Sequence, residues 1–414
     1  MEAASPQRLI ARGMQDSELS ARLRWRALRV IAAGKASPFM AMAFADVLGG
    51  NIRECVVIGT HRLGELPLQF VWQPSGHPLP DERSMAAGRR ALEVAGRTTE
   101  AEALVVLLSG GASALMAVPA GTLTLNDKRT AVDVLLKAGA DITTLNTVRK
   151  HLSAVKGGRL ACAAAGPTVC LAISDVVGDD LSVIGSGPTV PDPSTYADAL
   201  RCVERLGVSS QLPPAVIEYL QDGLRGRIAE TPKPGDACLE RSITRVIGGR
   251  MIAMAGAREA ARALRYEVVV IDEPVVGEAR VAGPALLERA RLVAGARPRP
   301  ACVIASGETT VNVTGKGKGG RNQEMALSVA RMLGDAAGDD AFASIGTDGV
   351  DGPTDAAGAF SHTTTLARAA QQGLDAAAHL TDNNAYGFFD RLDDLIITGP
   401  TTTNVGDLQV VLFR

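Results

Sequence analysis

Residues 28–48 read Leu-Arg-Val-Ile-Ala-Ala-Gly-Lys-Ala-Ser-Pro-Phe-Met-Ala-Met-Ala-Phe-Ala-Asp-Val-Leu. The first six residues form an apolar run typical of a buried strand, and a helical pattern begins at Pro38, a residue suited to a first helical turn. This alternation predicts an α/β domain whose mostly parallel sheet is covered by helices on both faces. It continues along the first half of the chain, with apolar runs at 55–59, 104–108 and 169–174 and helical patterns at 81–95, 128–138, 147–165 and 196–206.

The length of the chain predicts two domains, because 414 residues are too many for one ordinary core. A stretch rich in Pro and Gly at 231–236 suggests domains of residues 1–235 and 236–414. The net charge of −2 gives no reason to expect nucleic acid or an anionic membrane as partner. A second α/β unit is expected after the boundary, with strands at 243–247, 267–271, 301–305, 341–345, 395–398 and 410–413 and helices at 279–294 and 322–333.

The cysteines and the N-terminus bear on the compartment. Residues 1–29 contain acids and bases but no apolar core of the kind found in secretory signals, and we expect a cytoplasmic protein. The cysteines show no C-x-x-C spacing, so we predict small buried side chains in a reducing compartment, without zinc or a disulfide framework. They are Cys55, Cys162, Cys170, Cys202, Cys238 and Cys302.

The most distinctive loop lies within residues 312–324, which read Asn-Val-Thr-Gly-Lys-Gly-Lys-Gly-Gly-Arg-Asn-Gln-Glu. Glycines let backbone N–H groups turn toward an anion, and the helix expected from Asn322 adds a favourable dipole. A solvated basic turn is the alternative interpretation. The predicted phosphate-binding residues are Gly315, Lys316, Gly317, Lys318, Gly319 and Gly320.

The same loop allows a second hypothesis. Gly315, Gly317 and Gly320 have the spacing G-x-G-x-x-G, and Asp340 follows at about the distance of the acid in dinucleotide-binding folds. An oxidoreductase that uses a nicotinamide cofactor would fit this pattern. Two lysines within the turn favour a triphosphate, which carries more charge than a pyrophosphate. A non-catalytic nucleotide-binding module is a third hypothesis.

Polar loops follow two of the predicted strands, at the strand ends where α/β proteins bind ligands. Lys35 follows the strand at 28–33 and would point at a substrate, although a lone lysine there is often an ordinary surface residue. The loop after 104–108 has the glycines and hydroxyls of a second anion-binding loop, or of a tight turn that needs positive φ. Its predicted binding residues are Ser109, Gly110, Gly111 and Ser113.

Aspartates follow other predicted strands. Asp175 follows 169–173, and Asp348, Asp351 and Asp355 lie in a glycine-rich loop after 341–345. Aspartates near phosphates are typical Mg²⁺ ligands, so we predict a metal site of Asp175 with Asp348 or Asp355. Ordinary turn chemistry would account for one or two of these aspartates. The five histidines have no metal-ligand spacing, and each is predicted to be structural.

A cationic cluster lies within the helix expected at 147–165. Arg149, Ser153 and Lys156 would share one helical face, where they could hold the carboxylate of a substrate. Ser153 and Lys156 also form S-x-x-K, but the partner motifs of β-lactamases are missing, which makes that match a coincidence.

With these motifs in order along the chain, the sequence resembles the glycerate 2-kinases that carry a MOFRL domain. The resemblance implies a Rossmann-like N-terminal domain, a smaller α/β MOFRL domain and an active site in the cleft between them. Relatives of this kind are often labelled hydroxypyruvate reductase. The matching segments are 34–37, 76–82, 109–115, 146–160, 174–188, 192–195, 306–324 and 346–359.

The resemblance implies transfer of the γ-phosphoryl group of ATP to the 2-hydroxyl of D-glycerate, assisted by Mg²⁺. Lys35 and Arg321 would then be catalytic, the two glycine loops would hold phosphates, and Arg149 or Lys156 would bind the substrate carboxylate. Asn322 and Glu324 are further substrate-binding candidates. A homodimer is left open. The alternative activity is NAD(P)H-dependent reduction of hydroxypyruvate.

Overall fold

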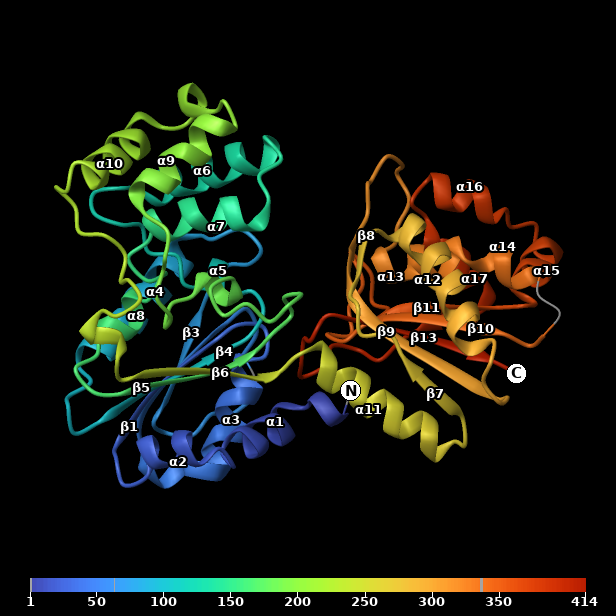
Figure 1. Ribbon diagram of the computed structural model, residues 1–414, viewed down its shortest axis with the longest axis horizontal. Coiled ribbons are helices and arrows are strands. Elements are labelled where there is room, and N and C mark those ends of the chain that lie inside the picture. Colours follow the sequence, from blue (N-terminus) through green and yellow to red (C-terminus); the bar gives the residue numbers. More distant parts are fainter. Residues whose placement is uncertain (1, 63, 336–337) are drawn as a thin grey trace. The chain divides into compact units, whose positions relative to one another are not determined.

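The computed structural model describes residues 2–62, 64–335 and 338–414. They form two compact units (Figure 1). The N-terminal unit comprises residues 6–174 and 179–247, and the C-terminal unit comprises residues 2–5, 175–178 and 248–414. No helix in these described ranges is long and apolar enough to cross a membrane.

The N-terminal unit is built on a six-stranded, all-parallel sheet with the order β3-β2-β1-β4-β5-β6. Every residue of β4 and β5 is buried, as expected for parallel strands covered on both faces. The chain steps outward from β1 to β2 and β3 and then returns to the other side of β1 with β4, so strand order reverses between β1 and β4. The strands are β1 (Leu28–Ala33), β2 (Ile52–Gly59), β3 (Phe70–Pro74), β4 (Ala103–Leu108), β5 (Thr168–Ile173) and β6 (Ser242–Gly248).

Helices cover this sheet, and four of them gather in a separate layer. In Figure 1, α6, α7, α9 and α10 lie together at the upper left, and they share one core that includes Leu135, Val148 and Tyr196. The helices are α1 (Pro6–Gly13), α2 (Ser17–Leu23), α3 (Ser37–Leu48), α4 (Glu82–Gly96), α5 (Ala112–Leu115), α6 (Leu125–Lys137), α7 (Ile142–His151), α8 (Arg159–Cys162), α9 (Tyr196–Arg205) and α10 (Pro214–Leu224). Short 3₁₀ turns are η1 (Glu2–Ala4), η2 (Gly49–Asn51), η3 (Ile184–Ser186), η4 (Ser209–Gln211) and η5 (Ala237–Leu239).

The C-terminal unit contains a mixed sheet with the order β12-β11-β10-β13-β9-β7, and β8 also pairs with β9. The pairs along the path from β12 to β9 are antiparallel, whereas β7 and β8 run parallel to β9. The strands are β7 (Glu267–Val270), β8 (Val275–Glu278), β9 (Ala301–Thr310), β10 (Ala341–Gly346), β11 (Gly358–His362), β12 (Leu395–Ile396) and β13 (Asp407–Phe413).

The two faces of this sheet pack against different helices because strand side chains alternate. Val303 of β9 packs in a core with α12 and α13, and its neighbour Ile304 packs with α11 on the opposite face. Figure 1 shows α11 on one side of the sheet and α12, α13 and α17 on the other. The helices are α11 (Arg250–Ala263), α12 (Ala279–Ala294), α13 (Arg321–Ser328), α14 (Ala330–Gly334), α15 (Thr365–Gln371), α16 (Ala376–Thr381) and α17 (Ala385–Leu392).

The predicted α/β class is confirmed, and β1 and α12 have the bounds expected from the sequence. Two other expectations were wrong. The helix predicted at 147–165 is interrupted after His151, because Ser153 bridges to Pro119 and Gly157 and Gly158 take positive φ. The helix predicted at 322–333 is divided into α13 and α14.

The strand predicted at 243–247 forms, but it lies beside β5 in the first sheet, although the sequence analysis assigned it to the second domain. The division of the chain into domains at residue 235 stays a prediction. The last strand, β13, lies within the second sheet between β10 and β9.

The expectation that no cysteines pair is corrected by a disulfide between Cys162 and Cys238. The two residues are separated by 76 positions in the sequence, so their spacing gave no sign of the bond. They meet because α8 lies against η5. Cys55, Cys170 and Cys302 are buried thiols, as expected.

Candidate active site

The loops after β1 and β4 are joined to each other at the point where strand order reverses. The Lys35 N–H donates to the Gly110 carbonyl at 2.8 Å, and the Ala36 N–H donates to Ser109 Oγ at 3.0 Å. Gly34 has φ +133°, and a Cβ there would lie 2.1 Å from Ser109 Oγ, so no larger residue fits. Ligands of open α/β sheets bind at this reversal point. The structure therefore brings together Lys35 and the loop at 109–113, which the sequence analysis named as separate candidates.

His77 lies beside these loops, although the sequence analysis assigned it a structural role. A Cβ on Gly111 would lie 3.1 Å from His77 Nε2 and 3.7 Å from Lys35 Cγ. Burial lowers the pKa of His77, and the positive charge of Lys35 lowers it further. A neutral imidazole beside the loop at 109–113 can exchange hydrogen bonds with a ligand.

Ser113, at the end of the second loop, is connected to a buried lysine. Lys156 Nζ donates to Ser113 Oγ at 2.6 Å and to the Ser113 carbonyl at 2.9 Å. Ser113 Oγ lies 3.0 Å from Ser186 Oγ, which donates to Asn146 Oδ1 at 3.1 Å. These contacts extend the loop into a polar network reaching α7. Neither Ser186 nor Asn146 was predicted to take part.

Two further cations, Lys128 on α6 and Arg149 on α7, lie close enough to Lys156 to lower its pKa. Burial lowers the pKa of Lys128 to about 7, and repulsion by Arg149 contributes. Burial places the pKa of Lys156 well below its usual value, and both Lys128 and Arg149 lower it further. The predicted pair of Arg149 and Lys156 is thus electrostatically coupled. It is assembled by tertiary folding, since the two residues do not share a helix.

The glycine loop of the C-terminal unit corrects a central expectation. Its backbone amides were expected to face a phosphate, but those of residues 314–318 donate to the segment 382–384. The glycines serve close packing: a Cβ on Gly315 would lie 2.2 Å from the Asp382 carbonyl oxygen, and one on Gly317 would lie 2.3 Å from Asn384 Cβ. The amides of residues 314–318 are thus used within the protein, while Gly319, Gly320 and the side chains of Lys316 and Lys318 stay candidates for binding an anion.

The start of α13 already holds an anion from the protein itself. Asp351 accepts from the N–H groups of Asn322 and Gln323 at 3.1 and 2.9 Å. Burial raises the pKa of Asp351 to about 6 against the effect of these hydrogen bonds, and Asp407 raises it further. The helix dipole that the sequence analysis assigned to a phosphate is therefore used by this carboxylate.

Arg321, predicted to be catalytic, forms a bidentate ion pair with Asp407, whose side chain is fully buried. Burial alone would lower the pKa of Arg321, but the hydrogen bond and charge of Asp407 raise it above its ordinary value. A second carboxylate, Glu308, lies 3.4 Å from the guanidinium. The arginine is thus fixed in position by acids.

The two substrate-binding candidates on α13 are both buried. Asn322 Nδ2 donates to Asp351 and Asp407, and its Oδ1 accepts from Ser344. Glu324 forms a bidentate pair with Arg280 and accepts from Asn383. These contacts explain both residues as parts of the packing around α13.

The predicted metal ligands have separate partners. Asp175 accepts from Asn404 at 3.0 Å, Asp355 accepts from the Tyr386 hydroxyl at 2.8 Å, and Asp348 accepts from the Val350 N–H at 3.2 Å. Among the described residues, no group of three or more His, Cys, Asp or Glu is arranged to hold a metal ion. Mg²⁺ in nucleotide sites commonly uses one or two carboxylates together with phosphates, so such a group is not required.

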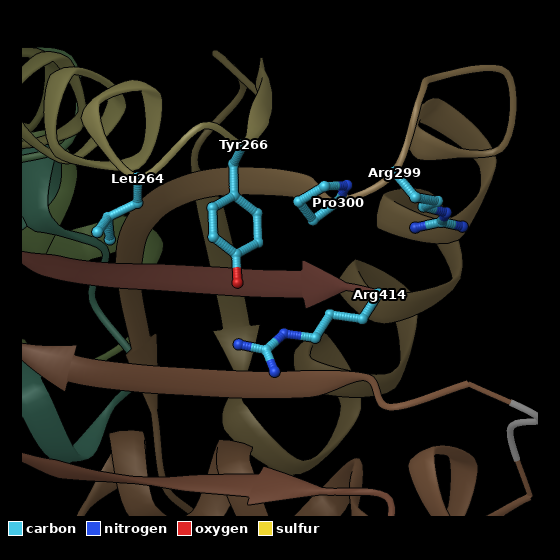
Figure 2. Close-up of a pocket in the computed structure, with 5 residues that line it drawn as sticks. All are labelled: Leu264, Tyr266, Arg299, Pro300 and Arg414. Carbon is cyan, nitrogen blue, oxygen red and sulfur yellow. The ribbon is translucent and has the colours of Figure 1, made fainter.

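A surface hollow in the C-terminal unit contains none of the predicted site residues. Figure 2 shows its lining, in which the Tyr266 hydroxyl points toward the guanidinium of Arg414. Arg299, also in the lining, stacks over the ring of Phe413 at 4.8 Å. Arg414 interacts with Tyr266 and Asp339, and we assign the hollow no role.

The parallel sheet, the joined loops at its reversal point and the buried cations define an α/β protein built to handle an anionic ligand. Residues 1–221 match a domain of unknown function, DUF4147, and residues 301–407 match the MOFRL family. The chain belongs to the glycerate 2-kinase family that combines these two domains.

Relatives agree with this assignment along most of the chain. The chain is 39% identical to the D-glycerate 2-kinase of Thermotoga maritima and 38% identical to the glycerate 2-kinase of Pyrococcus horikoshii. Each alignment covers 92% of this chain, with 90% and 86% of the relative. A crystal structure of glycerate kinase from Thermotoga maritima superposes with a TM-score of 0.88 at 37% identity, covering 100% of this chain and 96% of that one. A 39% identical protein of Agrobacterium vitis carries the provisional label hydroxypyruvate reductase.

Proposed function

We propose that the protein transfers the γ-phosphoryl group of ATP to the 2-hydroxyl of D-glycerate. The glycerate oxygen forms the new bond to phosphorus, the bond from phosphorus to the β–γ bridging oxygen breaks, and ADP leaves while the hydroxyl releases its proton. The observation that carries the proposal is the buried cation network attached to the Ser109–Ser113 loop, because D-glycerate and ATP are both anions. Relatives named glycerate 2-kinases support the substrate.

Lys35 and Arg321 are proposed to stabilise the charge that grows on the transferred group. The family resemblance supports these roles, and Lys35 lies on the loop joined to Ser109 and Gly110. A single cation of this kind contributes about 10³-fold or more to phosphoryl transfer. Arg321 is a suitable candidate because Glu308 and Asp407 hold its guanidinium in a fixed orientation. We further propose that Lys316 and Lys318 neutralise nucleotide phosphates through their side chains.

Mg²⁺ fits the donor chemistry of this chain, since carboxylate oxygens are its usual protein ligands. Asp175, with Asp348 or Asp355, would hold it. When bound, the ion would neutralise charge on the β- and γ-phosphates. We also propose a cytoplasmic location, which can be tested by thiol labelling of Cys162 and Cys238 in cells, because these two residues form a disulfide.

The alternative, a nicotinamide-dependent reductase, is less well supported. A dinucleotide would place its pyrophosphate at the start of α13, where the Asp351 carboxylate accepts from Asn322 and Gln323. Two anions in one place would repel each other.

The test is to incubate the purified protein with D-glycerate, ATP and Mg²⁺, to follow ADP release, and to identify the product. ADP release that requires glycerate and yields 2-phosphoglycerate is the expected result. NADH oxidation with hydroxypyruvate, in the absence of ADP release, would replace the kinase with the reductase.

A further inference from the structure

Three cations of the N-terminal unit, Lys128, Arg149 and Lys156, have no carboxylate partner among the residues that the structure describes. Lys128 is 4% exposed and Lys156 is 2% exposed, and Arg149 is half-buried beside them. In the part of the chain that the structure describes, none of the three forms an ion pair with a carboxylate, although their neighbour Lys150 pairs with Asp192. Like charges buried together without an anion are costly, so such an arrangement requires compensation.

Two donors in this region are unused. Lys128 Nζ is buried without a hydrogen-bond partner, and so is Asn146 Nδ2, whose side chain is 4% exposed. Asn146 and Arg149 are three positions apart on α7 and therefore lie on one face of that helix. Unsatisfied buried donors are uncommon in proteins, and each calls for a physical explanation.

Hydrogen bonds connect Asn146 to the proposed active site, and Lys128 lies close enough to Lys156 to lower its pKa. Asn146 Oδ1 accepts from Ser186, Ser186 contacts Ser113, and Ser113 accepts from Lys156. The α6 and α7 helices that carry Lys128 and Asn146 share one apolar core, which holds the two helices against each other.

We propose that Lys128, together with Asn146, Arg149 and Lys156, binds one oxyanion group of a substrate, which we assign as the carboxylate of D-glycerate. This inference rests on the proposed function for the identity of the ligand, and it adds Lys128 and Asn146 as specificity residues. A carboxylate has two oxygens and accepts several hydrogen bonds, which matches the two unused donors. Neutralisation by the ligand would also relieve the repulsion among the three cations.

The first test compares Lys128→Met with Lys137→Met. Both lysines are on α6, but Lys137 is exposed and pairs with Asp133 on the surface. Binding of D-glycerate is measured by calorimetry without ATP, so turnover is not needed. We expect affinity to weaken about 30-fold in Lys128→Met, because charge-assisted hydrogen bonds are strong, and to stay unchanged in Lys137→Met.

A second variant, Asn146→Asp, supplies an internal carboxylate to the same cations. We expect it to melt at a higher temperature than the wild type, because the new carboxylate neutralises the cations, and to lose glycerate binding; unchanged glycerate binding would overturn the site.

Steady-state assays then distinguish the carboxylate of glycerate from a phosphate of ATP as the bound oxyanion. A raised KM for glycerate with an unchanged KM for ATP supports the carboxylate assignment. A raised KM for ATP alone, with inorganic phosphate binding lost in calorimetry, would overturn that assignment in favour of a nucleotide phosphate. A lower melting temperature in Lys128→Met with unchanged glycerate binding would overturn the site itself. Glycerate binding that depends on Lys128, in a protein without ADP release, would keep the site and reject the proposed kinase.

Discussion

The chain contains two regions that the sequence analysis assigned to anion binding, and they differ in how their polar groups are satisfied. In residues 314–324 the amides of residues 314–318 donate to the segment 382–384, Arg321 pairs with Asp407, and Glu324 pairs with Arg280. In the network behind Ser109–Ser113, Lys128 Nζ and Asn146 Nδ2 have no partner. Glycines and lysines in a loop can be explained by contacts within the protein. Buried donors without a hydrogen-bond partner are therefore a better sign of a ligand site than glycine and lysine content.

The largest expected effect is on catalysis by Lys35→Ala. If Lys35 neutralises charge in the transition state, kcat should fall about 10³-fold while the protein stays folded. Circular dichroism and a coupled ADP assay measure the two properties, with Lys137→Ala as the surface control. An unchanged kcat would remove Lys35 from the transfer step.

The next largest effect is on stability and concerns residues 314–324, where polar groups have partners within the protein. Arg321→Ala leaves the fully buried Asp407 carboxylate without its bidentate partner, and breaking such a pair costs about 3–5 kcal/mol. Urea unfolding should show this loss in Arg321→Ala and recovery of most of it in the double variant Arg321→Met/Asp407→Asn. The kcat of the double variant then isolates catalysis: a wild-type value would mean that Arg321 serves only to neutralise Asp407.

A smaller loss of stability is expected at the glycine loop. A Cβ at position 317 would lie 2.3 Å from Asn384 Cβ, so Gly317→Ala should cost about 1–3 kcal/mol through overpacking. Gly96→Ala is the matched control, because nothing lies within 4 Å of a Cβ there. If Gly317→Ala instead kept wild-type stability and raised only the KM for ATP, the loop would be a phosphate cradle after all.

The smallest expected effect is a change in how steeply the free energy of unfolding varies with pH. The pKa of Lys128 is lowered by burial to about 7, with Arg149 contributing and Lys156 as the other neighbouring cation. Below pH 7 the lysine is charged in both states and its penalty is complete. Above pH 7 the folded protein loses this proton before the unfolded chain does, so stability rises with pH toward the unfolded pKa.

Lys128→Met should therefore flatten the unfolding free energy between about pH 7 and 10, measured by urea titration at several pH values. Parallel curves for the variant and the wild type would mean that Lys128 stays charged when buried. The contrast between the polar groups of residues 314–324 and those behind Ser109–Ser113 would then need revision.

Much of the fold was predictable because it depends on local patterns. The apolar run at Leu28–Ala33 forms β1, and the pattern at Ala279–Ala294 forms α12, with the predicted bounds in both cases. The helix expected at 147–165 failed at Gly157 and Gly158, where the backbone takes positive φ. The short edge strand β3 and the strand β11 were missed, since neither has a long apolar run.

The candidate site was predictable only in part. Lys35 and Ser109 stand directly after apolar strands, and parallel strands place their carboxyl ends at one edge of the sheet, so sequence position alone indicated them. Lys128, Asn146 and Ser186 carried no such sign. Their relation to Lys156 arises from the packing of separate elements.

The sequence by itself determined the α/β class, the strands that end in polar loops and the family, because periodicity and ordered motifs are properties of neighbouring residues. Only the tertiary structure decided which polar groups keep a free hydrogen-bonding capacity. The partners that satisfy them come from distant positions: Asp407 for Arg321, and residues 382–384 for the glycine loop. Satisfaction of a donor depends on atoms within about 3 Å, and folding rather than spacing along the chain brings those atoms together.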